Sequence, residues 1–105
     1  MPESPSLLSW CFDESAVPDY VDAFGYYEEQ GHIGDRFEED FRRAVNHIRA
    51  HPESGTVVTA EGARRWPLAV FKHTLYYTIE PDGIVIWAVA HDRRRPGYWR
   101  QRLES

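Results

Sequence analysis

The spacing of apolar residues in the first half of the chain predicts two amphipathic helices. Between Asp13 and Gln30, the residues Tyr20, Ala23, Phe24 and Tyr27 recur at intervals of three and four, with acidic residues on the other face. A second helix is predicted over 35–50, before Pro52. Its apolar stripe consists of Phe37, Phe41, Ala44, Val45 and Ile48. Because Gly31 and Gly34 leave only a short connection, the two helices should form an antiparallel hairpin.

The period of the pattern changes to two in the second half of the chain. Residues 75–80 alternate apolar and polar side chains, and Pro81-Asp82-Gly83 predicts a turn. The run 84–90 that follows is apolar on both faces. A strand covered on both faces belongs in the middle of a sheet, so we expect neighbours on each of its edges and the helices over one face.

Three further stretches complete the predicted sheet. Residues 68–73 are expected to form a strand bent near Pro67, residues 57–59 a short strand, and residues 7–12 an edge strand. The predicted fold class is α+β, with a helical hairpin packed on a small twisted antiparallel sheet. A length of 105 residues supports one domain, 1–105.

Composition narrows the class of protein. Cys11 is the only cysteine, so no internal disulfide can form. No apolar run approaches the roughly 18 residues of a membrane span, and the start MPESPSLLSW lacks the basic residues of a signal peptide. We therefore expect a cytoplasmic protein with no membrane partner and no cofactor.

Charge is distributed unevenly along the chain. Residues 1–50 hold four arginines against eleven acids, a balance of −7, and residues 51–105 hold eight basic residues against six acids, a balance of +2; together they give the net charge of −5. Within 91–102 there are five arginines and one acid, Asp92. This basic patch can attract an anionic partner although the whole protein is acidic, because screening confines each field to about 10 Å.

Four features of the chain together resemble the RelE/ParE superfamily of bacterial type II toxin–antitoxin toxins. They are YYEEQ with DRFEEDFRRAVNHIRAHPESG in the helical hairpin, RRWPLAVFKHTLYYTI in the middle strands, DGIVIWAVAHDRRRPGYW at the end, and the order strand, helix, helix, strands. The resemblance covers residues 13–102. It implies a cognate antitoxin whose segment wraps the toxin in a hetero-oligomer.

The superfamily has two branches, and the resemblance leaves both open. ParE-like toxins inhibit DNA gyrase by binding, whereas RelE-like toxins cleave messenger RNA on the ribosome. Endings like AVAHDRRRPGYW are common on the ParE side, and Lys72 is the only lysine here although RelE-like nucleases are usually lysine-rich. We therefore favour a ParE-like gyrase inhibitor, involved in plasmid stabilisation and growth arrest, over a ribosome-dependent mRNA endoribonuclease. A homologue that only binds its antitoxin is the third possibility.

Each reading assigns roles to particular residues. The gyrase reading uses the C-terminal segment as the target-binding site. Its residues are Arg93, Arg94, Arg95, Tyr98 and Trp99. An RNase would need cations for the phosphate and groups for proton transfer. The candidates are Arg65, His91, Arg93 and Tyr98. The exposed part of the hairpin's aromatic face, at Tyr20, Phe24 and Phe41, is the candidate antitoxin-binding surface.

Two other groups of residues are expected to be structural. His47 and His51 have the i, i+4 spacing of a metal pair, but no Glu or Cys at a matching spacing completes a site, so we predict no metal. Trp87 lies inside the apolar run and is expected in the core.

Overall fold

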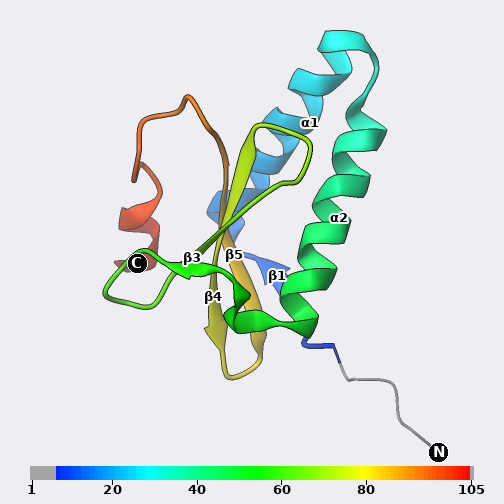
Figure 1. The fold of residues 1–105 in the computed structure, drawn as a ribbon. Helices are drawn as coiled ribbons and strands as arrows, with labels where there is room; N and C mark the ends of the chain where they lie inside the picture. The colour runs from blue at the N-terminus through cyan, green and yellow to red at the C-terminus, as the bar shows by residue number, and fades with distance from the viewer. Residues whose placement is uncertain (1–6, 105) are drawn as a thin grey trace, which may run out of the picture.

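The computed structural model describes residues 7–104 and contains two helices packed on a five-stranded sheet (Figure 1). The helices are α1 (Val17–Gly31) and α2 (Gly34–Ala50). The strands are β1 (Trp10–Phe12), β2 (Thr56–Val57), β3 (Arg64–Pro67), β4 (His73–Glu80) and β5 (Gly83–His91). Short 3-10 turns are η1 (Glu14–Ala16), η2 (Pro52–Ser54) and η3 (Arg100–Glu104). The predicted α+β class is confirmed.

The helical hairpin forms where the apolar spacing predicts it. Pro18 lies in the first turn of α1, where its missing N–H is not needed, and α1 ends at His32, whose φ of 58° is left-handed. The amide of Gly34 then donates to Oε1 of Glu28 at 2.9 Å, which begins α2 within three residues of the end of α1. The two helices run antiparallel, as expected (Figure 1).

The sheet has the order β1-β5-β4-β3-β2, so β5 is flanked on both edges as predicted. Pairing is antiparallel except that β1 runs parallel to β5, which makes the sheet mixed. The parallel pair arises because the whole helical hairpin and three strands separate β1 from β5 in sequence, so the chain need not reverse between them.

The strand predicted at 68–73 is wrong. The observed strand is β3 (Arg64–Pro67), and the chain from Leu68 to Lys72 forms a series of bends. Asp40 on α2 explains the difference, because its buried carboxylate accepts the amides of Val70 at 2.9 Å and Phe71 at 3.3 Å. Those amides therefore bond to a helix side chain instead of a neighbouring strand.

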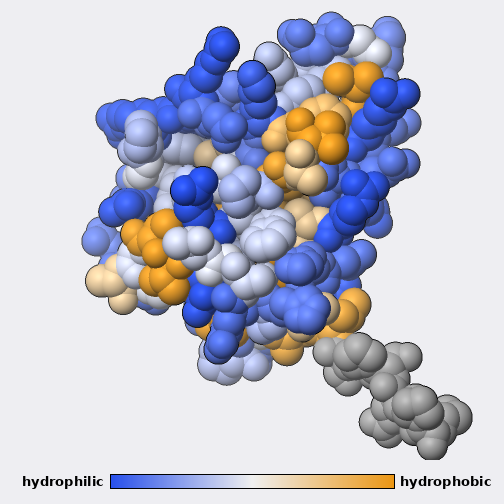
Figure 2. Space-filling view, viewed as in Figure 1, coloured by the Kyte–Doolittle hydropathy of each residue, from blue (hydrophilic) through white to orange (hydrophobic). Residues whose placement is uncertain are grey.

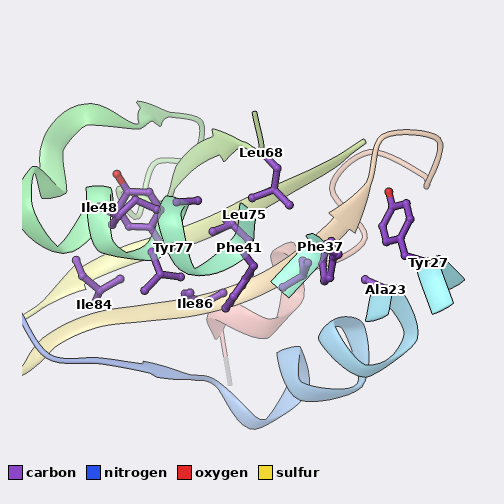
Figure 3. Close-up of a cluster of buried hydrophobic side chains, with 13 residues drawn as sticks. Ala23, Tyr27, Phe37, Phe41, Ile48, Leu68, Leu75, Tyr77, Ile84 and Ile86 are labelled. Atoms are coloured by element: carbon purple, nitrogen blue, oxygen red, sulfur yellow. The ribbon is translucent and has the colours of Figure 1, made fainter. Parts of the chain in front are cut away.

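The main core lies between the helices and one face of the sheet (Figure 3). Phe37, Phe41 and Ile48 from α2 meet Tyr77 from β4 and Ile86 from β5, and each of the five is at most 3% exposed. The apolar stripe read from the sequence is thus the buried face of α2.

A bulge in β5 lets one strand serve two cores. Tyr77 pairs with Ile86 but Tyr76 pairs with Ala88, so Trp87 is the extra residue. After the bulge the side-chain alternation reverses, and Ala88 faces the second core instead of the helices. The expectation that Trp87 lies in the core is corrected: it is half-buried, and its Nε1 donates to Thr78 Oγ1 at 2.8 Å.

The C-terminal segment covers the face of the sheet opposite the helices (Figure 1). Trp99 is 2% exposed and stacks on Tyr76, with ring centroids 4.3 Å apart. Tyr98, Ala63, Ala88 and Ala90 complete this second core. The sheet is therefore sandwiched between the helical hairpin and the C-terminal residues Tyr98, Trp99 and Leu103.

Candidate functional site

The basic segment follows directly from the end of β5. His91 ends the strand, its carbonyl accepts the Arg94 amide at 2.9 Å, and its Nδ1 accepts the Arg93 amide at 3.0 Å. The Asp92 amide bonds to the carbonyl of Lys72 at 2.9 Å. Arg93, Arg94 and Arg95 are exposed, and hydrophilic side chains cover this end of the molecule (Figure 2). A hydrogen-bonded turn on a central strand thus presents three cations to solvent.

Arg94 is the member of this group that the protein itself engages. Its guanidinium carbon lies 3.7 Å from the centroid of the Tyr98 ring, and Nη1 lies 3.8 Å from Oδ1 of Asp19. Half of the Arg94 side chain nevertheless remains exposed. Within residues 7–104, no acidic side chain forms an ion pair with Arg93 or Arg95.

Asp19 is a buried anion that ties the C-terminal segment to α1 and β5. Its Oδ2 accepts the Tyr98 hydroxyl at 2.8 Å, Nη1 of Arg102 at 2.8 Å and the Val89 amide at 3.2 Å. Nη2 of Arg102 reaches Oδ1 at 3.3 Å. Four donor atoms of three residues therefore converge on one carboxylate.

Electrostatics at Asp19 keep Tyr98 protonated. Burial raises the pKa of Tyr98, and the hydrogen bond to the Asp19 carboxylate raises it further. Burial, the largest single influence, would lower the pKa of Arg102, but the hydrogen bond to Asp19 and the attraction of nearby negative charge together outweigh it and the pKa is raised. The Tyr98 hydroxyl is therefore a donor to Asp19, which leaves it poorly placed to accept a substrate proton.

Asp19 and Arg102 were missed by the reasoning from sequence. A signal existed, because Asp19 lies on the buried stripe of α1 at i, i+4, i+8 with Ala23 and Tyr27. A carboxylate on an apolar stripe needs a buried partner. Nothing local to the sequence identifies Arg102, 83 residues away, as that partner.

A hollow of about 330 Å³ opens on the second-core face beside the basic turn, and we call it the arginine hollow. Its cations are Arg65 from β3 and Arg94 and Arg95 from the turn. The remaining lining residues are Pro67, Thr74, Tyr76, Ala90, His91, Asp92, Pro96, Gly97, Tyr98 and Trp99. Arg65 and Tyr76 are direct cross-strand neighbours, so their places in the hollow are fixed by the sheet.

A second hollow, of about 400 Å³, lies on the helix side of the same turn. Arg93 and Arg94 line it together with Asp22, Tyr26 and His91. The four candidates for an RNase are consequently divided. Arg65, His91 and Tyr98 line the arginine hollow, but the Tyr98 hydroxyl bonds to Asp19, and Arg93 lines the second hollow.

His91 faces a buried histidine across the strand pair. Its ring centroid is 5.0 Å from that of His73, and the Tyr27 hydroxyl lies 3.0 Å from Nδ1 of His73. Burial, with a further contribution from His91, lowers the pKa of His73 to about 4. His73 is therefore neutral at physiological pH.

Tyr98 and Trp99, predicted to bind a target, are 8% and 2% exposed. In this structure they support the turn from beneath, so a target would meet the arginines first. Of the three residues predicted to bind an antitoxin, Phe41 is 3% exposed and Tyr20 and Phe24 are half-buried.

Tyr20 and Phe41 line a third cavity, which we call the hairpin groove. It measures about 310 Å³ and runs between α2 and β1, where Trp10 and Phe12 complete an aromatic floor. Glu38, Arg42, Asn46 and Arg49 form a polar rim. The Tyr20 hydroxyl donates to Glu38 at 3.2 Å, and burial together with Glu38 raises the pKa of Tyr20 to about 12. Phe24 does not line this groove.

The two histidines of α2 pack against each other and against an aromatic ring. The rings of His47 and His51 are 5.1 Å apart, and His47 stacks on Trp66 at 4.6 Å. In the described part of the chain, no group of three His, Cys, Asp or Glu side chains is arranged to hold a metal ion. Nor does any helix of residues 7–104 have the length and apolar character needed to cross a bilayer.

The fold and the basic turn define a class of small α+β domains in which a helical hairpin and a basic C-terminal segment cover opposite faces of one sheet. A family model for the ParE toxin of type II toxin–antitoxin systems, parDE, matches residues 12–96. The chain therefore belongs to the ParE toxin family. The family also implies a cognate antitoxin as a partner.

A solved structure supports the same fold. The chain is similar to one from a chromosomal ParDE toxin–antitoxin system of P. aeruginosa, with a TM-score of 0.69 and 15% identity. The match covers 81% of this chain and 96% of the other. A search among curated proteins finds no match.

Proposed function

We propose that this protein inhibits DNA gyrase in the bacterial cytoplasm by binding it, and that a cognate antitoxin neutralises the inhibition. The observation that carries the proposal is the set of three exposed arginines held at the end of β5 in a member of the ParE family. Their base is rigid because β5 is an interior strand, paired with β1 and β4, and the turn is hydrogen-bonded at His91 and Asp92. A fixed backbone lowers the cost of binding, because only the arginine side chains, and not the turn itself, must be ordered against a partner.

The arrangement of the RNase candidates favours binding over catalysis. General acid–base cleavage needs the proton-transfer groups and the phosphate-binding cations around one reacting atom. Here Arg65 and Arg93 lie in different hollows, and the Tyr98 hydroxyl donates to Asp19. An RNA strand would therefore not meet all four groups at once without rearrangement of the C-terminal segment.

Purified protein tests the target directly. We expect it to inhibit supercoiling by gyrase and to leave RNA intact under the same conditions. Arg93→Ala/Arg94→Ala should relieve the inhibition, whereas Arg36→Ala/Arg42→Ala, which removes the same charge from the exposed face of α2, should not. Melting curves check that each variant is folded. Equal inhibition by both double variants would show that the basic turn is not the effector site.

The hairpin groove is the surface that best suits an antitoxin segment. An aromatic floor with a charged rim is the pattern that binds an amphipathic helix. Growth arrest caused by the toxin alone should be relieved when the product of the adjacent antitoxin gene is co-expressed. Tyr20→Ala should weaken that relief while the arrest persists, and Tyr26→Ala, on the same helix outside the groove, should not. Unchanged relief with Tyr20→Ala would place the antitoxin elsewhere.

A further inference from the structure

The arginine hollow carries positive charge that the protein does not neutralise. Three arginines and one acid, Asp92, line it, so the net charge of the lining residues is +2. Within residues 7–104, Arg65 and Arg95 have no ion-pair partner, and Arg94 is held loosely at 3.8 Å from Asp19. In a protein with a net charge of −5, a concentration of free guanidinium groups in one concavity indicates an anionic ligand.

The hollow also has an aromatic wall. Tyr76 is half-buried and lines the hollow, while Trp99 lies behind it at 4.3 Å with 29° between the ring planes. Because Trp99 supports one side of the ring, Tyr76 is held in a fixed orientation directly across from Arg65 on β3. Aromatic rings with adjacent arginines are the features that hold a base and its phosphate in sequence-tolerant binding of single strands.

The chemistry of the wall separates two kinds of anion. An acidic peptide would use the arginines through its carboxylates but would gain nothing from Tyr76. A phosphodiester with an attached base uses both, since arginine pairs with phosphate oxygens and the base stacks on the ring. A volume of about 330 Å³ falls in the range of small-ligand sites.

The proton-transfer candidates beside the hollow already have hydrogen-bond partners at the Tyr98 hydroxyl and at one ring nitrogen of His91. The Tyr98 hydroxyl donates to Asp19, and Nδ1 of His91 accepts the Arg93 amide. We infer that the arginine hollow binds single-stranded DNA without cleaving it, with Arg65 and Arg95 on a phosphodiester and Tyr76 beneath the adjoining base. This rests on the proposed function in one respect: the proposed target, gyrase, acts on DNA and not on RNA.

A titration without gyrase tests the inference separately from the proposed function. Fluorescence anisotropy follows a labelled DNA single strand of about 12 nucleotides, within the usual site size, as the full-length protein is added at several salt concentrations. Arg65→Ala/Arg95→Ala should weaken binding about tenfold and reduce the slope of log affinity against log salt by about 1.4, the value for two lost phosphate contacts. The charge-matched control is Arg36→Ala/Arg43→Ala, two exposed arginines of α2 outside the three cavities, which should keep the original slope.

Tyr76 provides a second, uncharged readout. Tyr76→Phe retains the stacking surface and should bind as the original does, whereas Tyr76→Ala should weaken binding roughly fivefold or more. Melting curves accompany each variant, and if Tyr76→Ala does not fold, the salt slope of the arginine pair decides.

Three results would overturn the inference. The first is an equal loss of affinity in the hollow and control double variants. The second is tighter binding of an oligoglutamate peptide of the same length with the same dependence on Arg65 and Arg95, which would assign the hollow to an acidic protein segment. The third is cleavage of the matching RNA strand, which would make the hollow an active site. If the Arg65→Ala/Arg95→Ala variant loses DNA binding but still inhibits gyrase, the inference about the hollow stands, because DNA binding and gyrase inhibition are then separate activities.

Discussion

Replacing Asp19 with asparagine tests how the C-terminal segment is held. The change keeps the shape of the side chain and removes its charge. Every group around the carboxylate is a donor: the Val89 amide, the Tyr98 hydroxyl, and the Arg94 and Arg102 guanidinium groups. Whichever way the new amide is turned, its NH₂ must face a donor, so at least one hydrogen bond is replaced by a repulsive contact.

The size of the effect follows from burial. The side chains of Asp19 and Arg102 are 5% and 16% exposed. A hydrogen bond to a charged group contributes about 1.5–3 kcal/mol, and breaking a buried ion pair costs about 3–5 kcal/mol. We expect Asp19→Asn to lower the free energy of unfolding by about 3 kcal/mol. In a domain of this size that corresponds to a fall in melting temperature of roughly 12–20 °C.

Urea unfolding followed by far-UV circular dichroism measures the change. Asp22→Asn is the matched control, because Asp22 is exposed on the same helix and its replacement should cost under about 0.5 kcal/mol. If Asp19→Asn and Asp22→Asn unfold at the same urea concentration, the buried carboxylate does not hold the segment and the reasoning fails.

Three further changes have expected outcomes. Tyr77→Phe removes the hydroxyl that accepts the Gly55 amide at 3.0 Å, and should cost about 1–3 kcal/mol in urea unfolding; no loss would mean that water replaces the hydroxyl. Gly83→Ala should cost about 2 kcal/mol or more, because φ is +136° and a Cβ would lie 2.2 Å from the Ser9 carbonyl oxygen; a melting temperature equal to that of the original protein would contradict this. Folding lowers the pKa of His73 from 6.5 to about 4. Between pH 6.5 and pH 4 only the unfolded chain takes up the proton, which favours unfolding. The free energy of unfolding should therefore be at its full value above about pH 6.5 and fall by roughly 2–3 kcal/mol towards pH 4. His73→Gln should flatten that pH dependence, and an unchanged pH profile would assign it to other groups.

The helices and the central strand could be predicted because their signals are local. The stripe from Phe37 to Ile48 has the helical period, and the run before His91 is apolar on both faces. Each pattern places apolar side chains where the folded protein buries them, so it identifies the buried face of the helix or strand. The strand predicted at 68–73 failed because carboxylate bonds from Asp40, about 30 residues earlier, decide the path of that segment.

The candidate site was only partly visible in the sequence. The arginines after β5 stand out as a charge cluster, and the structure presents all three to solvent. The sequence suggested Arg65 as a candidate but could not show where it lies in the fold. Its position beside Arg94 and Arg95 depends on the register of β3 with β4. The burial of Tyr98 and Trp99 depends on the bulge at Trp87, which turns Ala88 and Ala90 towards the second core.

By itself the sequence determined the helical hairpin, the central strand and the basic turn, because each depends on side chains close together along the chain. The tertiary structure alone decided that β1 runs parallel to β5, that Asp19 binds Tyr98 and Arg102, and that Arg65 joins the arginine hollow. Those contacts join residues far apart in sequence. They form only when the closing of long loops is offset by burial of the whole domain, which no short segment encodes.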